Sequence, residues 1–134
     1  MDINLTIAEI DNAHSVANLA QKNKDFGAYI SYFSNDLKYK QLNGKIIGRK
    51  QLLNDIQKYF DRVRSHISTY DRLSSSVNND LFIEKIVQKA TVTIRVFIFF
   101  SKTWTIEREG IYEWKKEDGI WKISNVEVIS EKII

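Results

Sequence analysis

Two polar side chains on a short alternating segment could hold a ligand by hydrogen bonds. Residues 37–42 alternate as a β-strand does, and Tyr39 and Gln41 fall on the same side of it as Leu37. A phenol can donate a hydrogen bond, and an amide can both donate and accept one. Apolar pockets commonly carry a few polar groups of this kind, so both residues are candidate ligand contacts. A Gln41 amide satisfied by the backbone is the competing interpretation.

A later segment adds one cation and two aromatic rings to the candidate contacts. Trp104, Arg108 and Tyr112 share one side of an alternating segment, residues 102–115. An arginine at a pocket mouth could clamp a carboxylate with two parallel hydrogen bonds. The competing interpretation is a cross-strand ion pair, in which Arg108 faces Glu127 if no bulge intervenes. Aromatic residues aligned in this way are more often core than ligand cage.

The two histidines could transfer protons, but the sequence identifies no acidic partner beyond Asp11. His14 lies at helical spacing near Asp11, so it is a weak candidate for a catalytic group, and a packing or surface role is favoured. His66 follows a predicted helix and is expected to be exposed. The chain has no cysteine, and two isolated histidines make a weak metal site, so we predict neither metal nor cofactor.

The first half of the chain predicts the helices and the hairpin that position these residues. The expected elements are helices at residues 6–24 and 25–33, strands at 37–42 and 45–47, and a helix at 50–63. Thr6 and Glu9 form a capping-box pattern, and Asp25 can cap the second helix. Asn43 and Gly44 together are a strong hairpin signal.

From His66 onward the alternation predicts a meander of four strands. The expected strands are residues 66–77, 81–100, 102–115 and 120–130. In the last strand Trp121 and Ile123 share one face, whereas Val126 and Val128 share the other. Either both faces are buried, as in a dimer contact, or a bulge near residues 124–125 resets the register. The order α-α-β-β-α-β-β-β-β predicts an α+β fold with helices on one sheet face.

The expected strand at residues 81–100 has two apolar sides, and its outer side predicts an interface. The side from Ala90 to Ile98 is wholly aliphatic and is expected to pack on the helices. The other side carries Arg95, Phe97 and Phe99, which would form an exposed patch. A homodimer with twofold symmetry through this outer face is the simplest arrangement. If the two faces are exchanged, Arg95 lines the pocket instead.

Composition restricts the class of partner. A chain of 134 residues, 43% hydrophobic and 28% charged, suits one domain spanning residues 1–134. The net charge of +3 is scattered along the chain, so we expect no nucleic-acid partner. No apolar run reaches membrane-spanning length, and the first residues lack the basic and apolar parts of a signal peptide, so no membrane association and a cytoplasmic location are expected. Richness in Lys, Asn and Ile is associated with bacterial genomes rich in A and T.

Four local patterns of the chain occur together: Asp25-Phe26 opening a short helix, residues 32–37 entering a strand, Gly44 followed by residues 48–50 entering a helix, and residues 112–114 followed by residues 119–123. Together these patterns resemble the nuclear-transport-factor-2-like superfamily, which includes SnoaL-like and ketosteroid-isomerase-like domains. The resemblance covers nearly the whole chain. It implies a cystatin-like cone, in which a curved, mostly antiparallel sheet wraps around N-terminal helices and holds a mostly apolar pocket. Dimerisation through the outer sheet face is common in this superfamily.

The resemblance does not extend to the catalytic residues of the isomerase members. Those members use a tyrosine, a general-base aspartate and a protonated aspartate. When the motifs are aligned, these positions fall on Ala17, Gln41 and Gly110, none of which can perform the corresponding role.

Three hypotheses of function follow. The first is a SnoaL-like domain that binds a small apolar or amphipathic molecule, with Tyr39, Gln41 and Arg108 as polar contacts. The second is an isomerase, cyclase or dehydratase-type enzyme without a cofactor, acting through His14 or an unrecognised acid. The third is a protein-binding module with a filled cone.

Overall fold

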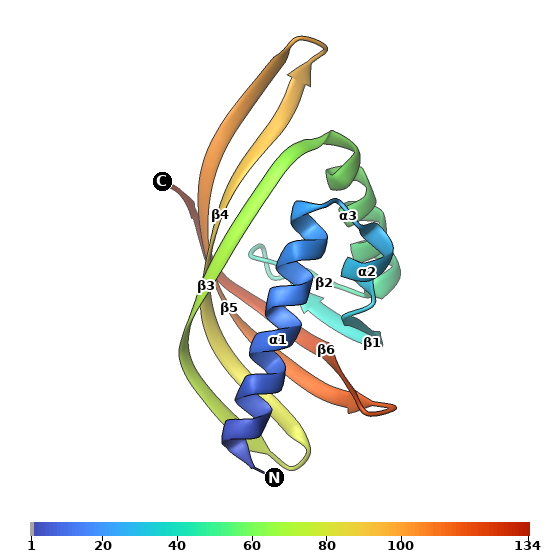
Figure 1. The fold of residues 1–134 in the computed structure, drawn as a ribbon, viewed down its shortest axis with the longest axis vertical. Coiled ribbons are helices and arrows are strands. Elements are labelled where there is room, and N and C mark those ends of the chain that lie inside the picture. Colours follow the sequence, from blue (N-terminus) through green and yellow to red (C-terminus); the bar gives the residue numbers. More distant parts are fainter. Residues whose placement is uncertain (1) are drawn as a thin grey trace.

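The computed structural model describes residues 2–134, and its elements follow the predicted order. The elements are α1 (Ile3–Lys22), α2 (Phe26–Ile30), β1 (Phe33–Lys40), β2 (Ile46–Ile47), α3 (Arg49–Arg62), β3 (Val63–Asn78), β4 (Leu81–Phe97), β5 (Phe100–Glu117) and β6 (Ile120–Ile133). The strands form one sheet in the order β2-β1-β6-β5-β4-β3. Only β1 and β6 pair in parallel; the other neighbours in this sheet are antiparallel. The sheet is curved, and the helices lie on its concave side (Figure 1). The α+β prediction is confirmed.

The starts of α1 and α2 are set by side chains that accept hydrogen bonds from free backbone amides. Asp2 caps α1 by accepting from the amides of Asn4 and Leu5. The predicted capping box at Thr6 is therefore wrong by one turn, and the Thr6 hydroxyl donates to the Asp2 carbonyl instead. Asp25 caps α2 as predicted, because its carboxylate accepts from the Ala28 amide.

Two bulges shape β6 and decide which of its residues face the helices. The register against β5 shifts where Glu113 pairs with Asn125 and Trp114 pairs with Ile123, so Ser124 is the extra residue. The predicted bulge is confirmed, and it lets Trp121, Ile123, Val126 and Val128 all be buried. A second shift, at Glu109 and Gly110, was not predicted.

The aliphatic side of β4 faces the helices only along part of its length. Ala90 and Ile94 are partly buried and Val92 is buried, as predicted. Val96 and Ile98 are exposed, because the end of the β4–β5 hairpin extends past the helices (Figure 1). Phe97 and Phe99 at this end are 69% and 90% exposed.

Among residues 2–134, no helix combines the length and the apolar character needed to cross a membrane.

Candidate functional site

A cavity of about 370 Å³ lies between the concave side of the sheet and the helices. All three helices contribute to its wall, and so do β1, β3, β4, β5 and β6. Most of the wall is aromatic or aliphatic, with Ala90, Val92 and Ile94 from β4 and Trp104 and Ile106 from β5. The volume lies within the range of small-molecule sites.

The structure brings all the sequence-predicted contacts to this one cavity. The five predicted ligand contacts that line it are Tyr39, Gln41, Trp104, Arg108 and Tyr112. The weak catalytic candidate, His14, also lines it. Their contact with a ligand stays a prediction, but their convergence on one cavity follows from β1 and β5 both flanking β6 in the sheet.

The polar groups at the end of β1, Tyr39 and Gln41, are available to a ligand. The backbone amide of Gln41 donates to the Lys45 carbonyl at 2.9 Å, but its side-chain amide has no protein partner among residues 2–134. The structure therefore does not support the interpretation in which the backbone satisfies the Gln41 side-chain amide. The Tyr39 hydroxyl likewise has no protein partner there, whereas the Tyr112 hydroxyl donates to Gln88 Oε1 at 3.1 Å.

Arg108 combines the two roles that the sequence left open. Its Nε donates to Glu131 Oε2 at 2.8 Å across strands β5 and β6. The predicted partner, Glu127, is wrong for two reasons. Trp121 pairs with Lys116 and not with Trp114, and the two bulges in β6 shift the register further, so that Glu127 lies opposite Ile111. Arg108 lines the cavity at the same time. Burial opposes its charge, but Tyr39, Tyr112 and Glu131 together hold the pKa of Arg108 above its ordinary value.

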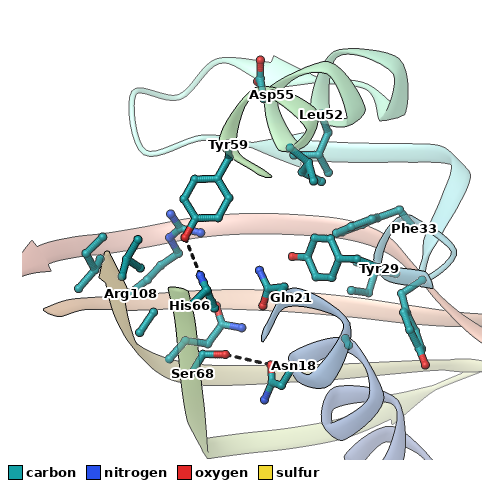
Figure 2. Close-up of a pocket in the computed structure, with 18 of the residues that line it drawn as sticks. Asn18, Gln21, Tyr29, Phe33, Leu52, Asp55, Tyr59, His66, Ser68 and Arg108 are labelled. Atoms are coloured by element: carbon teal, nitrogen blue, oxygen red, sulfur yellow. Dashed lines mark hydrogen bonds between the residues drawn. The ribbon is translucent and has the colours of Figure 1, made fainter. Parts of the chain in front are cut away.

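His66 is buried in the cavity wall, contrary to the predicted exposure. β3 begins at Val63, and a register shift between Val63 and Ser65 turns His66 toward the helices. Its Nδ1 lies 2.6 Å from the Tyr59 hydroxyl, which comes from α3 (Figure 2). Burial, and to a smaller extent the charge of Arg108, lower the pKa of His66 to about 4. His66 is therefore neutral at pH 7.

His14 is paired with an acid that the sequence reading missed. Its Nε2 lies 2.7 Å from Oε2 of Glu84, which is fully buried. The same oxygen accepts from Trp114 Nε1 at 2.7 Å. The other oxygen accepts from Arg72 Nε at 3.0 Å, and Arg72 also bonds Asp11 at 2.8 Å. Glu84 was missed because it is 70 residues from His14. The available signal was an acid on the same side of β4 as the apolar Phe82 and Ile86.

This arrangement orients His14 as a proton acceptor. Arg72 stabilises Glu84 as a carboxylate, so the proton of a neutral His14 belongs on Nε2, where it is donated to Glu84. Nδ1 of His14 has no hydrogen-bond partner within residues 2–134, whereas every fully buried side-chain nitrogen or oxygen there has one, so Nδ1 is not fully buried. His14 also lines the cavity.

Neither the three positions aligned with the isomerase residues nor a cluster of metal-ligating side chains supplies a further catalytic group within residues 2–134. Ala17 and Gln41 line the cavity, and Gly110 is buried beside the Glu127 carbonyl, so no acid comes from the three aligned positions. Among residues 2–134, no three His, Cys, Asp or Glu side chains are close enough together to hold a metal ion.

Comparison with known proteins identifies the fold. No known family profile matches this sequence, and neither does any curated protein. A conserved protein from Planctomyces limnophilus superposes with a TM-score of 0.85 at 11% identity, over 98% of this chain and 99% of that one. A type 2 hexachlorocyclohexane dehydrochlorinase (LinA) superposes at 0.76 with 14% identity, over 99% and 91%. A domain with a cystatin-like fold from Nostoc punctiforme superposes at 0.66 with 16% identity, over 96% and 78%. At these identities the likeness shows a shared fold and nothing finer.

Proposed function

Because the chain has the cystatin-like fold of nuclear-transport-factor-2-like proteins, we propose that it binds a small, largely apolar molecule between its helices and its sheet. The observation that carries the proposal is the cavity of about 370 Å³ with its aromatic and aliphatic wall. A cavity of this kind gains affinity by removing apolar ligand surface from water.

The polar groups in the wall support an amphipathic rather than a purely apolar ligand. The Tyr39 hydroxyl and the Gln41 amide both line the cavity without a protein partner among residues 2–134. A ligand oxygen that meets them would regain the hydrogen bonds it loses on leaving water. A wholly apolar ligand would leave them without partners.

The neutral dye N-phenyl-1-naphthylamine tests this proposal, because its fluorescence rises when it leaves water. The wild type is expected to bind the dye, and Ala90→Trp to lose at least tenfold in affinity, since the indole fills the cavity. Thr91→Trp is the matched control, because Thr91 is the next residue on the same strand and faces outward. No binding by the wild type, or equal loss in both variants, contradicts the proposal.

The pairing of His14 with Glu84 favours a second candidate, an enzyme that removes a proton from its ligand. The pair orients Nδ1 as a base at the cavity wall, as a general base requires. The fold accommodates catalysis, since one structural neighbour is a dehydrochlorinase.

Deuterium exchange on 2-acetylnaphthalene tests this second candidate. In heavy water a base in the cavity would take a methyl proton next to the carbonyl, and solvent would return a deuteron. The enzyme hypothesis predicts exchange above the buffer rate, lost in His14→Gln. Equal rates with wild type and His14→Gln reject a role for His14 in proton transfer to this ketone.

A further inference from the structure

Arg108 lies at the boundary between the cavity and a shallow groove outside it. The groove is formed by the β1–β2 turn and the end of β6, and it includes Leu42, Val128 and Glu131. Only three residues line both the cavity and the groove, among the residues that the structure describes: Tyr39, Gln41 and Arg108. A molecule that fills the cavity and reaches the groove would therefore have one end beside Arg108.

The guanidinium of Arg108 retains hydrogen-bonding capacity. Of its five N–H donors, the one on Nε is directed at Glu131. The two terminal nitrogens have no hydrogen-bond partner within residues 2–134. Two parallel donors on one planar group match the geometry of a carboxylate or a sulfonate.

The charge of the cavity wall also favours an anion. Among the described residues that line the cavity, Arg108 is the only Lys or Arg, and Asp55 is the only carboxylate. The Asp55 carboxylate points away from the other labelled side chains (Figure 2). Two other titratable groups of the wall, Tyr59 and His66, are neutral at pH 7, because burial raises the pKa of Tyr59 to about 12 and lowers that of His66 to about 4. Burial also raises the pKa of Tyr29, Tyr39 and Tyr112.

Glu131 compensates this positive charge only in part. The side chains of Arg108 and Glu131 are 38% and 36% exposed, so water and salt weaken the field of Glu131. Glu131 accepts from Nε and so fixes the plane of the guanidinium while the terminal nitrogens stay available. Glu131 is therefore a positioning residue for Arg108.

We propose that the ligand is an amphipathic monoanion, with a ring body in the cavity and a carboxylate or sulfonate held by the terminal nitrogens of Arg108. This inference rests on the proposed ligand-binding function and adds the charge and orientation of the ligand. A single arginine at one end of a largely apolar wall matches one negative charge at one end of an apolar body.

Two dyes with the same ring system separate this inference from the binding function itself. N-phenyl-1-naphthylamine is neutral, and 8-anilinonaphthalene-1-sulfonate adds one sulfonate to the same body. The wild type is expected to bind the anionic dye more tightly. Arg108→Gln is expected to lower affinity for the anionic dye about tenfold more than affinity for the neutral dye, as for a hydrogen-bonded charge.

Two further variants complete the set. Glu131→Gln keeps an acceptor for Nε but removes the competing charge, so the anionic dye is expected to bind about threefold more tightly. Arg64→Gln removes the same charge from an exposed position and is expected to change neither dye. Urea unfolding of each variant verifies that it is folded.

Each result has one meaning. Neutral-dye binding with no preference for the anionic dye, or equal losses in Arg108→Gln, overturns the anion inference and leaves the cavity function standing. Failure of the wild type to bind either dye overturns both. Equal weakening of the anionic dye in Arg64→Gln and Arg108→Gln would show that net charge attracts the dye, and it also overturns the assignment to Arg108.

Discussion

At the scale of single residues, two buried ionisable groups on neighbouring strands are accommodated in opposite ways. Glu84 is surrounded by three donors, from His14, Arg72 and Trp114, which satisfy a carboxylate. Among the residues that the structure describes, His66 has only the Tyr59 hydroxyl as partner, and it remains neutral. The buried carboxyl group of Glu84 is therefore matched by hydrogen-bond donors, whereas the buried imidazole of His66 stays uncharged.

The neutral state of His66 predicts a loss of stability in weak acid. Its folded pKa, about 4, lies below the unfolded value of 6.5, so between these values the unfolded chain binds more protons. The contribution is complete above pH 6.5 and is lost as the pH falls toward 4. Between pH 7 and pH 4.5 we expect His66 to lower the free energy of unfolding by about 2–3 kcal/mol.

Urea unfolding of wild type and His66→Gln at both pH values measures this effect. The drop in stability on acidification should be smaller by that amount in the variant, which has no imidazole to protonate and keeps a side-chain acceptor for Tyr59. An equal drop in the two proteins would show that His66 titrates alike in the folded and unfolded states.

At the scale of elements, the close pairing of β5 and β6 depends on a residue without a side chain. A Cβ on Gly110 would lie 3.1 Å from the Glu127 carbonyl oxygen and 3.2 Å from the Tyr112 ring. The carbonyl belongs to the neighbouring backbone at a bulge, so it cannot move without shifting β6. Gly110 therefore leaves room for the Tyr112 ring and the Glu127 carbonyl.

Gly110→Ala is expected to lower the free energy of unfolding by about 1–3 kcal/mol, because the added methyl overpacks the space between the strands. Urea unfolding measures the change. Gly27→Ala is the matched control: a methyl group added at Gly27 would have no other atom within 4 Å, and alanine favours the helix in which Gly27 lies. Equal stability of Gly110→Ala and the wild type would contradict this account of the strand contact.

Features that depend on neighbouring residues could be predicted from the sequence, whereas features that depend on distant pairings could not. The order of elements, the Asp25 cap and the Ser124 bulge depend on neighbouring residues, and all three are confirmed. The pairing of His14 with Glu84 joins residues 70 positions apart, and the bulge at Glu109 and Gly110 leaves no pattern in the alternation. Such features depend on strand register, which local patterns do not determine.

At the scale of the whole molecule, the end of the β4–β5 hairpin is an apolar surface that the helices leave uncovered. Phe97, Ile98, Phe99 and Phe100 are all exposed there. A contiguous apolar patch of this kind is typical of an interface. The homodimer predicted through Arg95, Phe97 and Phe99 would cover part of it.

Sedimentation equilibrium tests that homodimer. The wild type is expected to have twice the chain mass of 15.7 kDa, and Phe99→Ser to shift toward the monomer without loss of folded structure, since Phe99 has few contacts to lose. Thr103→Ser on the adjacent strand should leave the mass unchanged. A monomeric wild type would contradict the dimer and favour a different partner for this surface.

The central claim, that a ligand occupies the cavity, is tested most directly by nuclear Overhauser effects between bound N-phenyl-1-naphthylamine and protein methyl groups. The cavity and the exposed hairpin end are both apolar, but they carry different methyls. We predict effects to Ala90, Val92, Ile94 and Ile106, which line the cavity. Effects confined to Val96 and Ile98 at the hairpin end would place the dye on the outer surface and contradict the claim.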